Sequence, residues 1–460
     1  MKSLFPAKWL SFLSLLLFTF ISCQKDIRNE ARFQNEGQLK NHAQSIGELS
    51  PGNGVNESAE VVLDWYNLMM KLIIETPGHT PPIAARSFGY TGVALYESLI
   101  GKNPAYHSLA GQLNGLNSIP QRQYGNSYIA PLTANAALAR IIKHLFQNAS
   151  PGNMNEIDAL EAANQKLYSG RFNEVLISRS VDYGRQVAEA VFNWSVTDGG
   201  DQGYLRNFPA DFVPVVGIDK WIPTPPLFQP AMLPSWGKNR TMVAANGAGT
   251  IDPPAPPVFS MTAGSAFYVA AFEVYNAGVN LSPEQHDIAM YWNDGSGSFF
   301  PPGHNVAIAL QMIRSRQLNL DQAAALLAKV GIAQNDAAIV CWRAKFVHNV
   351  LRPETFIRNY IDPSWGTLIP TPPFPSYTSG HSTFSGAGAT ILTAELGDVS
   401  FTDSTKIPYG FSPRSFSNFY DYAQEAAVSR LYGGIHYRFD NENGFTCGQH
   451  IAMNVEHLNW

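Results

Sequence analysis

"PFPSYTSGHSTFSGAGATIL", residues 373–392, combines the start of a small-residue helix with three groups that a core helix does not need. Ser379 carries a hydroxyl and is a preferred residue type at a helix N-cap. Gly380 leaves its backbone N–H open, because no Cβ blocks a close approach. His381 carries an imidazole, which exchanges protons near neutral pH. The stretch therefore points to a function at the N-terminus of this helix.

Two further segments carry cations and a second imidazole. In "KFVHNVLRP", Lys345 and Arg352 are seven residues apart, so on a helix they share one face two turns apart. In "SRLYGGIHYRFD", Arg430 precedes His436 by six residues. A lysine and an arginine at helical spacing are usually a solvated face, and a Ser-Gly-His triplet is often only a cap beside a surface histidine. The three segments together are a stronger signal than any one alone.

Together these side chains can form a cradle for a compact tetrahedral oxyanion. Arginine matches such oxygens with a planar fork of donors, and lysine acts as a point charge. If the helix begins at Ser379, its N-terminal dipole adds to the anion-binding field. One imidazole can bond the central atom of the oxyanion, and the other can move protons on the opposite side. Asp440, four residues after His436, can accept the far ring N–H and fix its tautomer.

The order and spacing of the three segments, K-x6-R-P, S-G-H and S-R-x5-H-x3-D, resemble the signature shared by vanadium-dependent haloperoxidases and type 2 phosphatidic acid phosphatases. The resemblance implies that His436 bonds vanadium in a haloperoxidase or attacks phosphorus in a phosphatase. It implies that His381 is the acid–base residue, and that residues 373–392 form one wall of the oxyanion pocket. The oxyanion-binding residues that it implies are Lys345, Arg352, Ser379, Gly380 and Arg430.

The signature alone does not separate the two activities, because vanadate and phosphate share shape and charge. Trp342 and Phe374 match aromatic residues near the vanadate in chloroperoxidase-like members, although both also suit a core. Asp294 resembles a carboxylate that pairs with a site arginine, with an Asp-Gly turn as the local alternative. The segments "PPIAAR", "WIPTPP…LPSWG" and "YWNDGSG…PPGHN" resemble bacterial vanadium haloperoxidases. We therefore favour a haloperoxidase. The alternatives are an acid phosphatase of the same superfamily, which would hydrolyse phosphate monoesters through a phosphohistidine, and a non-catalytic lipoprotein.

The resemblance also implies the partners of the reaction. These are a vanadate cofactor, hydrogen peroxide as the oxidant, and a halide that leaves as hypohalous acid. Vanadate stays fully oxidised, while His381 assists proton transfer and Lys345 polarises the peroxide. The protein supplies charge neutralisation and preorganised donors. Iodide or bromide is the preferred halide, since iodide is the easiest to oxidise and some secreted bacterial relatives with a similar layout are iodide-selective.

Apolar residues at helical spacing predict an all-α fold, and the resemblance implies helical bundles of the vanadium haloperoxidase type with long Pro/Gly-rich connections. Residues 198–257 are too rich in proline and glycine to be helical throughout, and we expect them to line or cover a site. Residues 320–351 are expected to hold two helices. Residues 59–460 are predicted to form one helical haloperoxidase-like domain. Other helices are expected within 58–75, 81–100, 129–146, 173–194, 265–277, 282–294, 304–317, 373–392 and 420–437.

Residues 1–22 are predicted to be a signal peptide, because lysines flank the start of an apolar run, Trp9–Ile21, that is too short to span a membrane. The run ends in "FISC", which resembles a bacterial lipoprotein signal and implies lipid on Cys23. Residues 23–58 are polar and read as a tether. We expect an exported, membrane-anchored bacterial lipoprotein of the periplasm or cell surface, with an ordinary secretory signal as the alternative.

Composition narrows the remaining possibilities. A net charge of −5 disfavours nucleic acid as a partner, since a phosphate backbone needs a basic face. Besides Cys23 the chain has only Cys341 and Cys447, so stability rests on a core rather than on a disulfide framework. One bridge between these two cysteines is compatible with an oxidising compartment, and the sequence leaves the bridge and the oligomeric state open.

We predict that Cys23→Ser releases the protein from membranes into the soluble fraction, because the substitution removes the thiol that would carry the lipid. Immunoblots of membrane and soluble fractions from cells that express either form measure the distribution. Unchanged membrane association of the variant would contradict lipid attachment at this cysteine.

Overall fold

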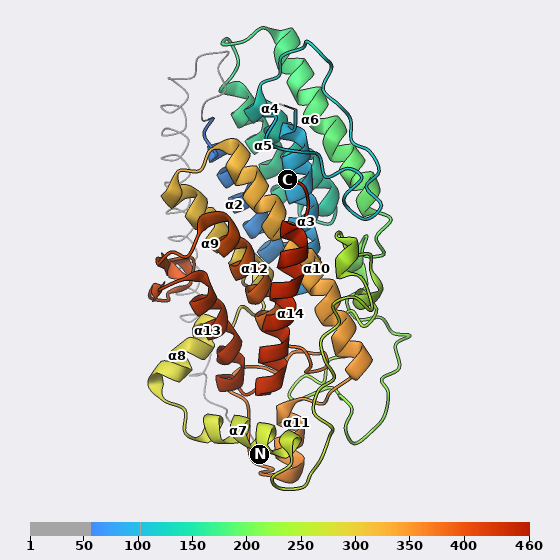
Figure 1. The fold of residues 1–460 in the computed structure, drawn as a ribbon, viewed down its shortest axis with the longest axis vertical. Coiled ribbons are helices and arrows are strands. Elements are labelled where there is room, and N and C mark those ends of the chain that lie inside the picture. Colours follow the sequence, from blue (N-terminus) through green and yellow to red (C-terminus); the bar gives the residue numbers. More distant parts are fainter. Residues whose placement is uncertain (1–56, 102) are drawn as a thin grey trace, which may run out of the picture. The chain divides into compact units, whose positions relative to one another are not determined.

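The structure, a computed structural model, describes residues 57–101 and 103–460. The predicted signal peptide, the predicted lipidation site Cys23 and nearly all of the predicted tether lie outside the described residues. From Asn56 onward the chain forms one compact unit. Its described part consists of α-helices joined by irregular segments and one short β-ribbon (Figure 1), so the predicted all-α fold is confirmed.

The described helices are α2 (Glu60–Glu75), α3 (Pro81–Leu99), α4 (Ala130–Leu145), α5 (Pro151–Lys166), α6 (Glu174–Ser195), α7 (Ala266–Val279), α8 (Pro283–Tyr291), α9 (Phe300–Arg316), α10 (Leu320–His348), α11 (Pro353–Tyr360), α12 (Gly380–Leu396), α13 (Phe419–Tyr432) and α14 (Arg438–Glu456). Capping residues begin several of them. The side chains of Asn173, Ser282 and Asn319 each accept a hydrogen bond from a backbone N–H of the following turn. Helices α5, α11 and α14 are absent from the sequence-based prediction.

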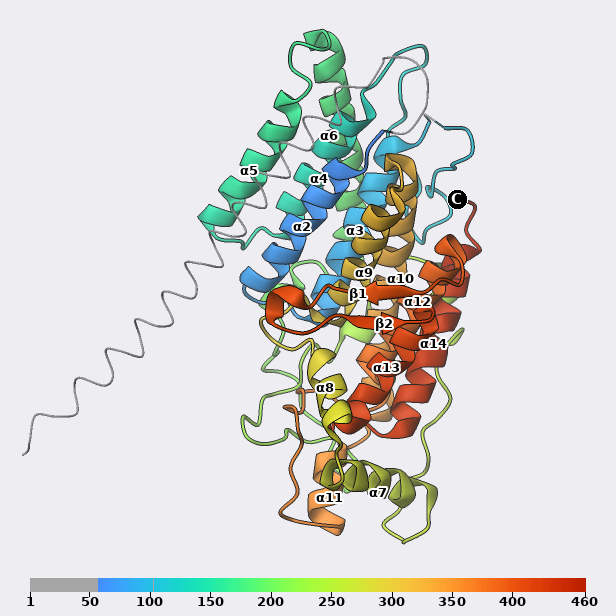
Figure 2. The same ribbon diagram turned by 90° about the vertical axis from the view of Figure 1, so that its left-hand side faces the viewer.

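Helix α10 connects two groups of helices. It packs against α3, which belongs to a group formed by α2 to α6, and against α12, which belongs to a group with α9, α13 and α14 (Figures 1 and 2). By length and composition α10 is the one described helix that could cross a membrane. Its most apolar 18-residue stretch lies entirely inside the fold, as in a core helix.

The prediction of two helices in residues 320–351 is wrong, because α10 is one continuous helix of 29 residues. Its central polar residues find partners on other elements. Gln334 Nε2 donates to the Phe384 carbonyl (2.9 Å), and the Asp336 carboxylate accepts from the Met242 N–H (2.7 Å). These contacts give Gln334 Nε2 and the Asp336 carboxylate partners inside the core, so the helix can continue through them.

Small residues bring the helices of each group close together. A Cβ on Gly448 of α14 would lie 2.2 Å from the Thr383 carbonyl oxygen of α12, and a Cβ on Gly386 would lie 2.5 Å from the Phe445 carbonyl oxygen. A Cβ on Gly331 would likewise lie 2.5 Å from the Phe88 carbonyl oxygen, where α10 meets α3. These approaches exclude any larger side chain, so the glycines set the position of α12 against its neighbours.

The Pro/Gly-rich connection between α6 and α7 runs beside α10. It is irregular apart from three short 3-10 turns, Gly203–Leu205, Trp236–Lys238 and Ala244–Asn246. The Met232 N–H donates to the Pro373 carbonyl (2.8 Å), and the Met232 carbonyl accepts from Trp342 Nε1 (3.2 Å). The connection therefore lies against both the end of α10 and the loop that leads into α12.

The sequence shows no alternation long enough for a sheet, and the structure adds only a two-stranded ribbon. Strand β1 (Phe401–Asp403) pairs antiparallel with β2 (Arg414–Phe416), with Thr402 opposite Ser415. Three residues per strand are too few to produce a recognisable pattern. The ribbon follows α12 and places Asp403 in the interior, where it is fully buried.

We predict that Gly448→Ala lowers the free energy of unfolding by about 1–3 kcal/mol, the usual effect of overpacking a well-packed core. The cause is the contact that the new methyl group makes with the Thr383 carbonyl. Thermal or urea unfolding followed by circular dichroism measures the change. Gly152→Ala on α5 is the matched control, since its Cβ meets nothing closer than 3.7 Å. Equal stability of the two variants would contradict the close packing of α12 and α14.

Candidate active site

Five helices bring the three sequence segments to one place. Lys345 lies in the last turn of α10, Arg352 is the N-cap of α11, and Arg430 lies in the last turn of α13. Ser379 is the N-cap of α12, and His436 lies between α13 and α14. Hydrogen bonds connect the segments to one another, as described below. The residues that the signature predicts therefore share one site in the structure.

His436 is held in one tautomer by Asp440. Its Nδ1 lies 2.8 Å from Asp440 Oδ2, and its Nε2 lies 3.1 Å from Nη1 of Arg352. Because a guanidinium only donates, Nε2 accepts, and the ring proton is therefore on Nδ1. Burial, together with the nearby cations, holds the pKa of His436 well below its usual range. The side chain is thus a neutral imidazole whose Nε2 lone pair faces the cations.

Ser376 supports the same carboxylate, and the sequence analysis missed it. Its hydroxyl donates to Asp440 Oδ2 (2.5 Å), and the Tyr437 N–H donates to the same oxygen (3.2 Å). Burial raises the pKa of the Asp440 carboxyl, while the hydrogen bond from Ser376 opposes that rise. Nothing in the sequence distinguishes Ser376 from other loop serines, although it lies only three residues before Ser379.

Arg352 has a buried donor that no described atom accepts. Its Nε donates to the Phe374 carbonyl (2.8 Å), and its Nη1 donates to the Ile435 carbonyl (2.8 Å) as well as to His436. Its Nη2 is buried and has no hydrogen-bond partner among the described atoms. An unsatisfied donor on a buried guanidinium is costly, so this position suits a bound anion.

Lys345 holds the loop that leads into α12. Its ammonium lies 3.0 Å from the carbonyl oxygens of Pro375 and Ser376 and 2.5 Å from that of Thr378. The same ammonium lies 4.9 Å from the centre of the Phe374 ring. Lys345 is fully buried, and burial lowers its pKa. The lysine thus fixes the turn that positions Ser379, and it also contributes a positive charge to the site.

Both predicted aromatic residues lie beside the cations. The Phe374 ring lies between Lys345 and Arg352, with the Arg352 Cζ 5.0 Å from its centre. The Trp342 ring lies 5.0 Å from the Phe374 ring and 6.0 Å from the Lys345 ammonium. Both side chains are also buried, so they serve the core and the site together.

The N-terminus of α12 faces open space. The Ser379 hydroxyl accepts from the Ser382 N–H (3.4 Å), and the Ser379 N–H donates to the Asp440 carbonyl (3.0 Å). A Cβ on Gly380 would meet only a ring carbon of Phe384, at 3.7 Å. The first turn of this 17-residue helix therefore offers N–H groups and a positive dipole end to an approaching anion.

His381 is partly exposed and lies next to Arg430. Its Nε2 lies 3.3 Å from Nη1 of Arg430, and the ring also hydrogen-bonds to the backbone of Asn293. Burial of the ring and the Arg430 charge hold the pKa of His381 well below its usual range. Arg430 Nη2 donates to the Ala289 carbonyl (3.2 Å), and burial lowers the pKa of Arg430 to about 10. His381 is thus a neutral imidazole in a partly exposed residue.

Asp294 does not form the ion pair with a site arginine that the resemblance implies. Its carboxylate pairs with Lys406 and lies 2.9 Å from Nδ1 of His304. Lys406 and His304 come from other elements and take the place of the expected partner. The negative charge of Asp294 still acts on Arg430 and His381, where it raises both pKa values against the effect of burial.

Two other residues near the signature segments have partners outside the signature. The His348 ring packs edge-on against Tyr377 at 5.2 Å, and Arg343 pairs with Asp252 (2.6 Å). Cys341 and Cys447 are both free and buried, so the bridge that the sequence leaves open is not formed.

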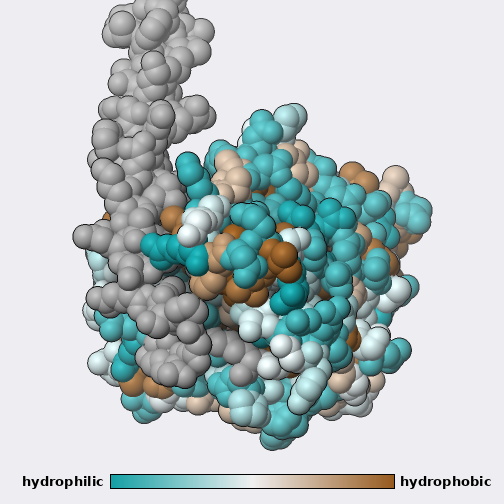
Figure 3. All heavy atoms as spheres, turned by 90° about the horizontal axis from the view of Figure 1, so that it is seen from above, coloured by the Kyte–Doolittle hydropathy of each residue, from teal (hydrophilic) through white to brown (hydrophobic). Residues whose placement is uncertain are grey.

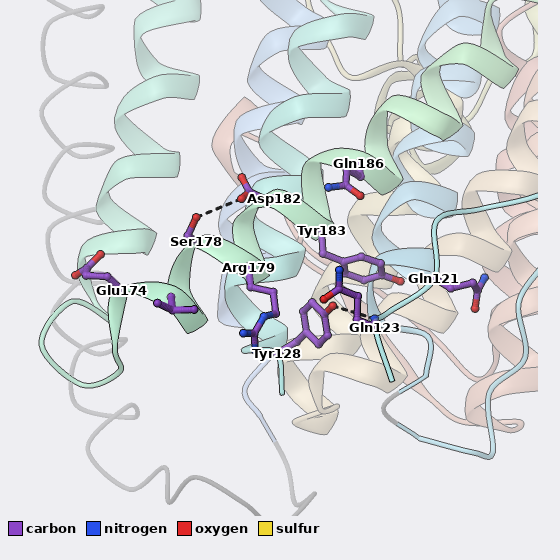
Figure 4. Close-up of a pocket in the computed structure, with 10 residues that line it drawn as sticks. Gln121, Gln123, Tyr128, Glu174, Ser178, Arg179, Asp182, Tyr183 and Gln186 are labelled. Atoms are coloured by element: carbon purple, nitrogen blue, oxygen red, sulfur yellow. Dashed lines mark hydrogen bonds between the residues drawn. The ribbon is translucent and has the colours of Figure 1, made fainter. Parts of the chain in front are cut away.

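A pocket of about 550 Å³ lies elsewhere, between α6 and residues 121–128 (Figure 4). It is lined by polar groups such as Arg179 and Asp182 and contains none of the signature residues. The surface at that end of the described unit is mostly hydrophilic (Figure 3). Among the described residues, no group of three or more His, Cys, Asp or Glu side chains is placed to hold a bare metal ion. The cradle of cations is therefore the better candidate site.

Comparisons with known proteins agree with this geometry. The family model described as "VCPO second helical-bundle domain" matches residues 325–363 and 359–459, which contain every residue of the signature. A vanadium chloroperoxidase from Curvularia inaequalis is 27% identical over an alignment of 222 residues, and the match covers 35% of this chain. The chain matches about a third, 36%, of the length of that relative.

Solved structures extend the similarity to most of the chain. A bacterial vanadium-dependent iodoperoxidase is 35% identical, with a TM-score of 0.79, and the alignment covers 88% of this chain and 97% of that one. The holo form of a bacterial vanadium-dependent chloroperoxidase has a TM-score of 0.63 at 16% identity, covering 83% of this chain and 92% of that one. The second comparison shows a common fold.

We predict that the protein takes up protons when a tetrahedral oxyanion binds to it at pH 8. Burial lowers the pKa of Lys345 to about 7, so at pH 8 only part of the protein carries the Lys345 ammonium. A bound negative charge raises this pKa again, so the site gains a fraction of a proton. Sulfate is a suitable probe because it stays fully deprotonated at this pH. Calorimetric titrations in buffers of different ionisation enthalpy measure the uptake.

Lys345→Arg is the matched variant for this measurement. An arginine keeps the positive charge but remains protonated throughout, so sulfate binding to the variant takes up fewer protons than binding to the wild type. Equal proton uptake by the two proteins would show that Lys345 is not the group that titrates.

Proposed function

Since the chain belongs to the vanadium-dependent haloperoxidase family, we propose that it oxidises a halide with hydrogen peroxide to hypohalous acid, with vanadate held in the cradle of cations. The observation that carries the proposal is the arrangement of three buried cations and a neutral histidine around the open N-terminus of α12. Vanadate, when bound, supplies the Lewis acidity that activates hydrogen peroxide without a change in the oxidation state of the metal.

The residues present fit a vanadate ion. Arg352 Nη2 is a buried donor without a described partner, and the space before Gly380 would be narrowed by any side chain. An oxyanion with four oxygens would satisfy that donor and the N–H groups of the helix terminus. His436 would bond the central atom through Nε2, in place of the hydrogen bond that Nε2 accepts from Arg352, because Asp440 holds the proton on Nδ1.

The cations have a charge-balancing role in this proposal. Lys345, Arg352 and Arg430 neutralise the negative charge that collects on the oxyanion during the reaction, and their fixed positions avoid reorganisation. Lys345 stays on the carbonyls of the 375–378 turn, so its ammonium is oriented before substrate arrives.

His381 is the residue that moves protons. Its neutral ring is ready to accept a proton from hydrogen peroxide, and Arg430 next to Nε2 disfavours the protonated form. Partial exposure lets water or substrate reach the ring. A low pKa makes the resulting imidazolium a strong acid, which returns the proton to the departing oxygen.

Iodide or bromide is the proposed halide. The support is the name of the 35% identical solved structure, which is an iodoperoxidase. Iodide is also the easiest of the three common halides to oxidise. Phe374 and Trp342 place aromatic surface beside the cations, an environment that suits a large and weakly hydrated anion better than a small one.

We also propose that the enzyme is attached to a membrane by a lipid on Cys23 and acts outside the cytoplasm. The support is the sequence "FISC" at the end of the predicted signal peptide, together with the polar composition of residues 23–58. Export would place a hypohalous acid, which attacks thiols and amines indiscriminately, away from the cell interior.

We predict that the purified chain, loaded with orthovanadate, oxidises iodide or bromide when hydrogen peroxide is added. His436→Ala abolishes the activity, and moderate added vanadate does not restore it, because the bond to the central atom is lost. His381→Ala lowers the rate by about 10²- to 10⁴-fold, the usual contribution of general acid–base catalysis, while vanadate affinity stays within a few-fold. A colorimetric triiodide assay and vanadate titration measure the two effects.

The vanadate-free chain tests the phosphatase alternative in parallel. The same cradle accepts phosphate, so hydrolysis of a phosphate monoester by this form, with no halide oxidation after vanadate loading, would favour the phosphatase. Lys329→Gln is the control for effects of substitution that are unrelated to the site. Lys329 pairs with Glu395 and Glu456 instead of the cradle. It lies 16 residues before Lys345 on α10, about 24 Å along the helix.

A further inference from the structure

A buried cluster of four charged side chains lies behind His381. The ion cluster consists of Asp294, His304, Asp403 and Lys406, which are all less than 5% exposed. Asp294 comes from the α8–α9 loop, His304 from α9, and the other two from β1 and the turn after it. Two negative and two positive charges balance one another if His304 is protonated. None of the four belongs to the three-part signature, and only Asp294 is among the residues that the resemblance implies.

The geometry favours a protonated His304, although the Thr405 hydroxyl also lies 3.0 Å from its Nε2. Its Nδ1 lies 2.9 Å from Asp294 Oδ2, and its Nε2 lies 2.9 Å from Asp403 Oδ2. Ionised carboxylates only accept hydrogen bonds, so both ring nitrogens carry a proton and the ring is an imidazolium. Burial lowers the pKa of His304, but the two carboxylates outweigh it and raise the pKa to about 9. The ring also stacks on Trp292 at 4.5 Å, which fixes its plane.

The ion cluster reaches the active site through the loop that carries Asp294. Asn293, its neighbour, provides the backbone partner of the His381 ring. Asp294 itself has a φ of +43°, a left-handed conformation that is unusual for a residue with a side chain. Strained residues of this kind persist only where surrounding contacts hold them, and here the contacts are His304 and Lys406.

Charged and titratable groups surround both histidines. Those that face His304 are Asp294, Asp403 and Tyr291, and Lys406 reaches the same cluster through Asp294. Those that act on His381 are Arg430, Asp294 and His304. His381 therefore meets one negative and two positive charges. Removing a positive charge raises the pKa of His381, and removing the negative charge lowers it.

We propose that His304 is a positioning residue for proton transfer: held between Asp294 and Asp403, its imidazolium fixes the loop that bonds the His381 ring and balances the charge that His381 meets. The role rests on the proposed acid–base function of His381. Asp403 and Lys406 have supporting roles in this arrangement. Asp403 holds the far side of the His304 ring, and Lys406 neutralises Asp294.

Two variants separate this role from a merely structural one. His304→Gln removes a positive charge, so protonation of His381 becomes more favourable. The acidic limb of the pH profile of kcat/KM for iodide oxidation therefore moves to higher pH. Asp294→Asn removes a negative charge and moves the acidic limb of the same profile to lower pH, as long as Asp403 keeps His304 protonated in the variant. Each shift is expected to be about half to one pH unit, and only a charge effect gives opposite directions. Lys329→Gln leaves the profile in place.

A second measurement does not depend on halide oxidation. In the full chain with isotopically labelled histidine, nuclear magnetic resonance titration follows His304 and His381, assigned by comparison with His304→Gln and His381→Gln. His304 stays protonated above pH 8 in the wild type, and Asp403→Asn lowers its pKa. The pKa of His381 rises in His304→Gln and falls in Asp294→Asn.

The outcomes distinguish the inference from the proposed function. A neutral His304 at pH 7, or a His381 pKa that moves in the same direction in both variants, would overturn the role of His304. Opposite movements of that pKa support the role even in a chain that does not oxidise halide, and such a chain would contradict the proposed function alone.

Discussion

The active site depends on the burial of three cations that are compensated by backbone carbonyl groups. Lys345, Arg352 and Arg430 are at most 1% exposed. Taking a cation out of water costs several kcal/mol unless polar partners replace the solvent. The carbonyls that do so belong to Phe374, Pro375, Ser376, Thr378, Ile435 and Ala289. Apart from Ala289, which lies in α8, these residues belong to the loops before α12 and after α13, so both loops must turn their carbonyl groups inward, and this requirement fixes their paths.

Carbonyl partners satisfy the hydrogen bonds of a cation but leave its net charge in place. The uncompensated charge explains several features at once. It helps to keep His436 and His381 neutral, and it leaves Arg352 Nη2 without a partner. A site of this kind is unstable relative to one filled by an anion, so its affinity for an oxyanion follows from the same arrangement that positions the loops. Carboxylates in place of these carbonyl groups would have stabilised the cations and lowered the affinity of the site for an oxyanion.

The residues of the cradle could be grouped from the sequence because each lies near the end of a helix and within a short segment. Asp440 and His436 are four residues apart, so their contact is local and could be expected. The ion cluster could not be expected, since His304 and Asp403 are 99 residues apart and no spacing rule links them. The same limitation led to the wrong partner for Asp294. Likewise, the continuity of α10 depends on contacts that Gln334 and Asp336 make with distant elements.

The two histidines of the site are controlled in different ways, and this difference matches two different tasks. His436 is fully enclosed, and a direct hydrogen bond to Asp440 fixes its proton, as a ligand requires. His381 has a backbone partner and an arginine instead, and its ring edge is partly exposed. A carboxylate bonded directly to His381 would stabilise the imidazolium and make it a poor acid. Asp294 lies one residue from that backbone partner, and its charge is balanced by His304 and Lys406, an arrangement that suits the proton transfer proposed for His381.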